Sequence, residues 1–287
     1  MAVCDVCSNL SKIKFLTDSC DNELKAKASE VGVDVNNKTI LEIINEIELN
    51  FVENLPKPLL NFRGKDITEL SQFNDTASNI SVSWSGNPPV ENNGVKTTSG
   101  KYGTFTYDFA SFDEFTMVYT VTLLERGHWV AMLNLGREGS KYGLKVEHNA
   151  NQNYTSNVQL EGVNQRSSDA NSLVPVIGSA VSTQMTIARN RPYNIALRVS
   201  LTNGVDAYLN GTLVHHFEQP EDLKGFNPNN WTNIRDNAFN RRLSNNDSNI
   251  SAIHHSLRIW NVALNDARLQ EEINQDIVDY GIEVANV

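Results

Sequence analysis

The sequence contains little cysteine. Its three cysteines, Cys4, Cys7 and Cys20, all fall within the first twenty of 287 residues. Disulfide bonds therefore cannot brace the rest of the chain, and a small disulfide-built fold is excluded. Three thiols without a nearby histidine also fall short of the four ligands of a structural zinc site. A fourth ligand would have to come from elsewhere in the chain or from a neighbouring subunit, so we expect reduced thiols and no metal.

An excess of positive charge is missing as well. The chain has 24 basic against 34 acidic residues and a formal net charge of -10, which argues against a nucleic-acid partner. No apolar run reaches the length that spans a bilayer, so we expect no membrane insertion. Residues Met1 to Cys7 lack the basic start and apolar run of a secretory signal. We therefore expect an unexported chain whose Asn-x-Ser/Thr triplets, at Asn79, Asn210 and Asn249, stay unmodified.

Residues 1–61 are predicted to form a small helical segment that ends in a proline-containing linker. Thr39 and Glu42 have the spacing of a capping box. The residues that follow recur at helical spacing on one face: Ile40, Ile44, Ile47 and Phe51. This stripe has two interpretations, a helix packed within its own unit or a seam for assembly with identical subunits or a larger particle. Two heptads are too short for a free-standing coiled coil.

Residues 62–287 show the pattern of an all-β domain. Many short segments that alternate apolar and polar residues or are rich in β-formers are separated by Gly- and Asn-rich turns. These segments predict a mainly β fold, an antiparallel jelly-roll β-sandwich with a small N-terminal helical segment. The expected strands are Ile80–Trp84, Gly100–Phe109, Phe115–Leu123, His128–Leu135, Tyr142–His148, Val158–Leu160, Ser182–Ala188, a hairpin of residues 193–199 and 205–214, and Ile253–Trp260.

Two C-terminal motifs resemble a known superfamily. Tyr208-Leu209-Asn210-Gly211 forms a tight turn in the hairpin, and Leu257-Arg258-Ile259-Trp260-Asn261-Val262-Ala263-Leu264 leads from a strand toward a helix. Asn265 can cap that helix, whose inward stripe would be Leu269, Ile273 and Ile277. The pair resembles the closing signature of the concanavalin A-like lectin/glucanase superfamily, in its laminin-G-like jelly-roll branch. These are folding features, so the resemblance implies architecture more than function.

The enzymes of that superfamily carry a Glu-x-Asp-x-x-Glu strand, which points its acids at one sugar ring. No such run occurs in this sequence. Glu46-Ile47-Glu48 lies in a predicted helix, and Asp113-Glu114 precedes a strand without a third acid. We therefore expect no catalytic residues and no enzymatic activity. A glycoside hydrolase with unfamiliar acids, brought together only by folding, remains an alternative.

The sugar-binding members of the superfamily stack sugars on exposed aromatic rings. Trp231, flanked by Asn230 and Asn233, is the predicted carbohydrate-binding group, since the amides can recognise hydroxyls beside the ring. The alternative is that Trp231 closes one end of the sandwich. The resemblance also leaves calcium open as a loop-ordering ion, with Asn245–Asp247 and Ser168–Asn171 as donors. We expect no other cofactor.

Two histidine pairs, His215-His216 and His254-His255, suggest a metal site at first sight. Neighbouring strand residues face opposite sides of a sheet, so we expect neither pair to clamp one ion.

The layout resembles that of bacteriophage fibre and capsid-decoration proteins, with an anchor at one end and an adhesive jelly-roll at the other. A chain without signal or disulfides fits a virion protein assembled in the host cytoplasm. We therefore predict a non-enzymatic structural or adhesion protein. Its partners would be other virion proteins, copies of itself in a homo-oligomer, and host-surface glycans. The alternative is a free carbohydrate-binding lectin-like module.

Overall fold

The computed structural model of the chain describes residues 28, 42, 56–109, 112, 114–125, 130–138, 141–150, 156–162, 189–200, 202–217, 236–241 and 250–283. The chain divides into two compact units, Met1–Pro56 and Lys57–Val287. Only Ala28, Glu42 and Pro56 of the first unit are described, so the anchoring role of residues 1–61 stays a prediction. The stripe of Ile40, Ile44, Ile47 and Phe51 lies outside the described residues.

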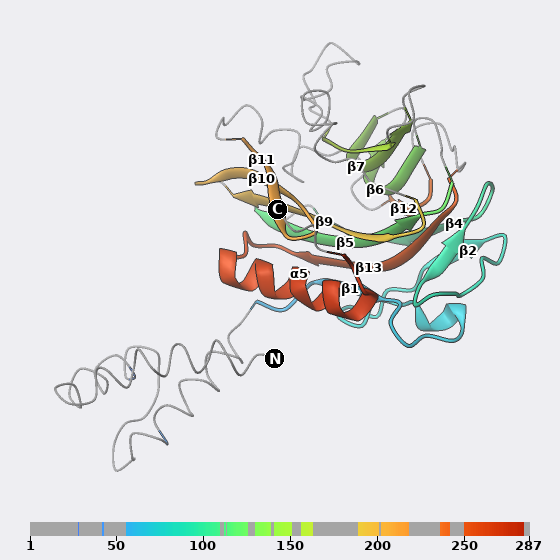
Figure 1. Cartoon of the computed structure of the whole chain (residues 1–287), viewed down its shortest axis with the longest axis horizontal. Helices are drawn as coiled ribbons and strands as arrows, with labels where there is room; N and C mark the ends of the chain where they lie inside the picture. Colours follow the sequence, from blue (N-terminus) through green and yellow to red (C-terminus); the bar gives the residue numbers. More distant parts are fainter. Residues whose placement is uncertain are drawn as a thin grey trace. The chain divides into compact units, whose positions relative to one another are not determined.

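The second unit is a sandwich of two antiparallel sheets, which confirms the predicted mainly β fold (Figure 1). Within the described residues, one sheet has seven strands in the order β1-β13-β5-β9-β10-β11, and β3 also pairs with β13. Its strands are β1 (Leu60–Arg63), β3 (Val95–Thr97), β5 (Phe115–Leu123), β9 (Pro192–Ser200), β10 (Gly204–Leu209), β11 (Thr212–Phe217) and β13 (Ala252–Trp260).

The second sheet has six strands among the described residues, in the order β2-β4-β12-β6-β7-β8. They are β2 (Ser83–Ser85), β4 (Tyr102–Thr106), β6 (Val130–Glu138), β7 (Lys141–Ala150), β8 (Ser156–Gly162) and β12 (Asp236–Phe239). A short 3-10 helix, η1 (Leu70–Gln72), follows β1, and α5 (Asp266–Tyr280) follows β13. Among the described residues, no helix is long and apolar enough to cross a membrane.

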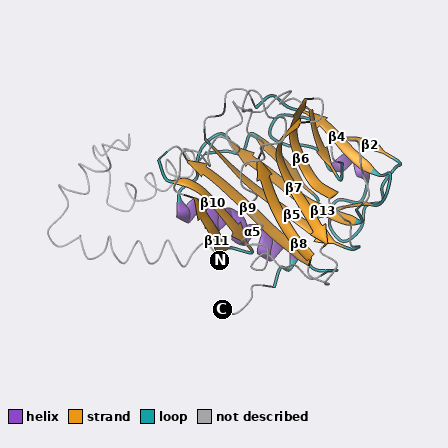
Figure 2. Cartoon of the chain, turned by 90° about the horizontal axis from the view of Figure 1, so that it is seen from above, coloured by secondary structure: helices purple, strands orange, loops and turns teal. Residues whose placement is uncertain are grey.

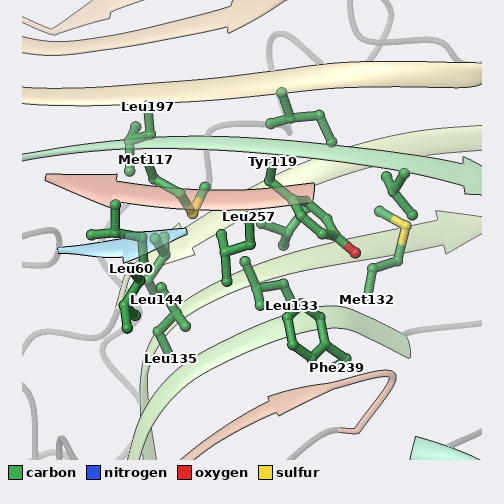
Figure 3. Packing of buried hydrophobic residues seen from close by; sticks show 14 of the residues in the cluster. Leu60, Met117, Tyr119, Met132, Leu133, Leu135, Leu144, Leu197, Phe239 and Leu257 are labelled. Atoms are coloured by element: carbon green, nitrogen blue, oxygen red, sulfur yellow. The ribbon is translucent and has the colours of Figure 1, made fainter. Parts of the chain in front are cut away.

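The main core lies between the two sheets. Residues Met117, Tyr119, Leu197 and Leu257 of the seven-stranded sheet point toward residues of the six-stranded sheet (Figure 3). Their partners there include Met132, Leu133, Leu135, Leu144 and Phe239. Alternate residues of a strand face opposite sides, so β5, buried along all nine residues, must be covered on its other side as well.

Helix α5 supplies this second cover (Figure 2). It begins with Asn265, whose side chain accepts a hydrogen bond from the Arg268 amide, and is followed by Gly281 at φ 63°. The predicted stripe of Leu269, Ile273 and Ile277 packs on the outer face of the seven-stranded sheet. There it meets Val118, Ala196, Tyr208 and the fully buried Trp260. The sequence-based prediction of this helix, its cap and its apolar face is therefore confirmed.

Tight reversals explain why asparagine recurs in the loops. Asn210 and Gly211 have φ of 49° and 84° and separate β10 from β11, so the predicted second arm of the hairpin is two strands. Seven of the eight described non-glycine residues with positive φ are asparagines. Asparagine tolerates this left-handed region better than most side chains, because its short amide can bond to the local backbone.

Predicted strand boundaries are wrong at Ile80–Trp84 and at Gly100–Phe109, where β4 covers only Tyr102–Thr106. The segment Ile80–Trp84 forms a strand only from Ser83, although Ile80 and Val82 still pack against the core. The Ile80 carbonyl accepts from the Asp75 amide at 3.0 Å, which closes a turn in place of a sheet pairing. Strand β1 begins at Leu60, two residues before the predicted domain boundary, because Leu60 pairs with Ile259. The expected strand Ser182–Ala188 lies outside the described residues.

Candidate functional site

A groove of about 490 Å³ lies beside α5, on the outer side of the seven-stranded sheet. The end of β1, the turn that follows it and strand β13 supply one set of its lining residues: Arg63, Lys65, Asp66 and Arg258. Helix α5 supplies the other: Arg268, Glu271, Glu272, Gln275 and Asp279. All except Gln275 are charged, so the groove is polar throughout.

The charges of the groove are joined in one continuous series of contacts, which we call the ion-pair ladder. Arg268 pairs with Glu271 at 2.7 Å and also with Glu272. Glu272 in turn pairs with Arg258, whose other terminal nitrogen lies 2.7 Å from Asp276. At the other end, Asp279 pairs with Arg63 and, at 2.5 Å, with Lys65. Charges that would repel one another are thus interleaved with opposite ones.

Asp276 is the buried centre of the ladder. Its side chain is fully buried, and one carboxylate oxygen accepts hydrogen bonds from Thr120 and Ser256 at 2.7 Å each and from Asn194 at 3.2 Å. The other oxygen faces Arg258. A buried carboxylate needs this many partners because its desolvation is costly. Asp276 therefore fixes α5 to three strands at once, β5, β9 and β13.

A close backbone contact sets the lip of the groove. A Cβ atom at Gly64 would lie 2.7 Å from the Asn93 carbonyl oxygen and 2.8 Å from the Gly94 Cα. Both are backbone atoms and cannot move aside easily. Asp66, two residues later, has φ 62° and turns the chain into the lip. The absence of a side chain at Gly64 thereby lets the turn after β1 pack closely on Asn93 and Gly94.

The ladder shifts the titration of Asp279 and Lys65. Burial alone raises the pKa of Asp279, but hydrogen bonds from Lys65 and Gln275 and the nearby Arg63 charge outweigh it, so the pKa falls below its ordinary value. The pKa of Lys65 is raised, first by its hydrogen bond to Asp279 and then by the charge of that carboxylate. Both groups are therefore charged throughout the neutral range.

We expect Asp279 to stabilise the sandwich at neutral pH and this stabilisation to be lost only at acid pH. A lowered carboxyl pKa contributes stability above the ordinary value of 3.8, and this is lost as pH falls through the lowered pKa. The contribution of Lys65 is present below 10.5 and is lost as pH rises through its raised pKa. Thermal unfolding of the parent and of Asp279→Asn should therefore differ in acid slope below about pH 4. Parallel curves there would contradict the assignment.

Three of the four acids that line the groove are held in ion pairs: Glu271, Glu272 and Asp279. A glycosidase needs a general acid whose pKa is raised, so that the carboxyl is still protonated at working pH. The pKa of Asp279 is shifted in the opposite direction. Glu271 and Glu272 are each paired with an arginine.

The histidine pair of β13 faces opposite sides, as predicted. His254 lies between the sheets, where Tyr119 Oη is 2.7 Å from Nδ1 and Thr97 Oγ1 is 3.0 Å from Nε2. Burial, with a smaller effect of His255, lowers the pKa of His254 to about 3, so it stays neutral. His255 points to the α5 side and contacts Thr122 and Tyr280. Of the second pair, His216 bonds to Asp206.

The predicted carbohydrate-binding residues Trp231, Asn230 and Asn233 lie outside the described residues, as do the calcium donors Asn245–Asp247 and Ser168–Asn171. The groove itself was not predicted. One signal for it is present in the sequence. Glu272, Asp276 and Asp279 recur at helical spacing beside the apolar stripe, and Arg258 stands between the apolar Leu257 and Ile259 of β13. Acids on a half-buried helix face require a cation from the partner element.

The comparisons with known proteins identify relatives in structure only. No protein-family profile matches the chain, and no curated protein matches its sequence at a significant level. The receptor-binding domain of a botulinum neurotoxin C/D mosaic serotype superposes with a TM-score of 0.55 at 13% identity, over 77% of this chain and 52% of that one. A sialidase from Trypanosoma rangeli gives 0.52 at 16% identity, over 76% and 33%.

Domain 4 of AbnA, a GH43 extracellular arabinanase from Geobacillus stearothermophilus solved with arabinotriose, gives a TM-score of 0.51 at 12% identity. The superposition includes 75% of this chain and 98% of the arabinanase domain. The chain thus spans about half of the neurotoxin domain but nearly the whole arabinanase domain. At these identities the likeness establishes the fold alone, a β-sandwich.

Proposed function

We propose that the sandwich is a glycan-binding module without catalytic activity, and that the groove beside α5 holds the glycan. The observation that carries the proposal is a groove of ligand size, about 490 Å³, lined entirely by hydrogen-bonding side chains. Carboxylates accept from sugar hydroxyls, guanidinium groups donate to them, and the Gln275 amide does both. Arabinotriose in the structurally similar arabinanase domain supports a glycan as the ligand class.

A glycan array probed with the full chain tests the proposal. We expect Gln275→Ala, on the exposed part of the groove, to weaken binding to a positive glycan by about tenfold, as loss of a hydrogen bond to a bound polar ligand typically does. Asn274→Ala is the matched control, because Asn274 is an exposed neighbour on α5 that does not line the groove. Unchanged binding by Gln275→Ala would reject the groove as the site.

Trp231 is the competing site. If Trp231, with Asn230 and Asn233, forms the binding surface, Trp231→Ala will abolish binding while Gln275→Ala leaves it intact, since stacking is lost. No binding to any glycan by the parent chain would reject glycan recognition altogether. Release of reducing sugar from mixed polysaccharides would reject the non-catalytic assignment in favour of a hydrolase.

We further propose that the module belongs to a virus particle of bacteriophage type, assembled in the host cytoplasm. Residues 1–61, with the stripe Ile40, Ile44, Ile47 and Phe51, would attach it to other virion proteins or to copies of itself, and the sandwich would bind host-surface glycans. Support comes from the division of the chain into two compact units at Pro56. Mass spectrometry of purified particles tests this, and absence of the chain from them would reject it.

A further inference from the structure

The charges that line the groove balance. Four basic side chains, Arg63, Lys65, Arg258 and Arg268, lie with four acidic ones and the neutral Gln275. Every one of the four basic groups already has a carboxylate partner in the ion-pair ladder. The groove therefore has a formal charge of zero and offers its cations in pairs with acids.

An anionic sugar would bind poorly in such a groove. Its carboxylate or sulfate would have to displace one of these acids from its cation, or approach a pair whose acid repels it. Like charges brought together at a binding site carry a large cost, and complementary charge is what steers an anionic ligand. Glu271, with a side chain 59% exposed, is an acid of the groove that such a ligand would meet.

A sugar hydroxyl fits the same groups without separating them. It can donate to a carboxylate and accept from the neighbouring cation at the same time, so it can bridge an ion pair that remains intact. The partly exposed members of the ladder are suited to this. The side chains of Arg63 and Lys65 are 27% and 43% exposed and flank the nearly buried Asp279.

From this geometry we infer that the groove selects neutral glycans, with hydroxyls and without carboxylate, sulfate or phosphate groups. This inference rests on the proposed glycan-binding function and adds the chemical class of the ligand. It also accounts for the groove charges being interleaved, because a site for anionic sugars would leave an arginine or lysine without an acid beside it.

Matched pairs of glycans test the inference with the full chain. Each neutral oligosaccharide is paired with its sialylated or uronic acid counterpart of the same backbone, and binding is measured by calorimetry at low and high salt. We expect the neutral member to bind about tenfold more tightly or better, with affinity nearly independent of salt. Tighter binding of the anionic member, or a steep fall of affinity with salt, would overturn the inference while leaving glycan binding intact. Binding to neither member would instead overturn the proposed function itself.

A charge variant tests the role of the groove in this selection. Glu271→Gln removes one exposed acid, and we expect it to reduce the preference for the neutral member several-fold by relieving repulsion of the anionic one. Glu283→Gln makes the same change of net charge at an acid that is 73% exposed and pairs with Arg191, away from the groove. Equal effects of the two variants would show that overall charge decides, and would overturn the inference.

Discussion

Replacing Asp276 by alanine is expected to lower the free energy of unfolding of the sandwich by about 3–5 kcal/mol, the range for breaking a buried ion pair by removing one partner. The variant leaves Arg258, only 2% exposed, short of one of its two carboxylates. It also strands the hydroxyls of Thr120 and Ser256, which both donate to Asp276. Buried polar groups without partners cost more than the bonds themselves contribute.

Chemical denaturation followed by near-ultraviolet circular dichroism would measure this loss. Asp276→Asn distinguishes the loss of the negative charge from the loss of side-chain volume. The amide has nearly the volume of the carboxylate but cannot form an ion pair with Arg258. Asp266→Asn is the control for a general loss of acidic charge on α5, since the Asp266 side chain is 82% exposed and its pair with Arg198 should contribute about 1 kcal/mol or less. A change below about 1 kcal/mol for Asp276→Ala would contradict the central role of this carboxylate.

Replacing Trp260 by alanine is expected to cost a similar amount, about 3–5 kcal/mol. The indole is fully buried between the seven-stranded sheet and α5, against Val118, Leu269 and Ile273. Its removal opens a cavity beneath the helix that carries one wall of the groove. Glycan binding should therefore weaken along with stability, although Trp260 does not line the groove.

The same denaturation assay measures Trp260→Ala, with fluorescence excluded as a probe because the substitution removes a fluorophore. Val278→Ala serves as the control on the other side of the helix, where Val278 is 72% exposed and truncation should change stability by about 0.5 kcal/mol or less. Comparable losses for Trp260→Ala and Val278→Ala would show that α5 is not held by its apolar face.

The parts of the fold that were predictable from the sequence have strong local signals. The predicted strand Phe115–Leu123 has the same bounds as β5. Its nine residues are rich in β-branched and aromatic side chains, which favour a strand over a helix. The asparagine cap and apolar stripe identified α5. Strands β3 and β12 were not predicted, since three or four residues carry no recognisable period and owe their pairing to neighbouring strands.

The candidate site was beyond sequence reasoning for a related reason. Its lining residues come from 63–66 at the start of the sandwich and from 258–279 at its end, and only the sheet order brings these segments together. The sequence signal for sugar binding is an exposed aromatic ring, and Trp231 was predicted on that basis. An ion pair has no comparable sequence signal. An isolated acidic or basic residue is expected to lie on the solvent-exposed surface until its partner in the folded structure is known.

Strand β1 and the Arg63–Asp279 pair have a mechanical consequence. The linker at Lys57 leads directly into β1, which is bound along four residues to β13 and, through Arg63 and Lys65, to the last turn of α5. A force that pulls on the chain at Lys57 would therefore act on two sets of contacts together. These are the hydrogen bonds between β1 and β13 and the ion pairs of Arg63 and Lys65 with Asp279.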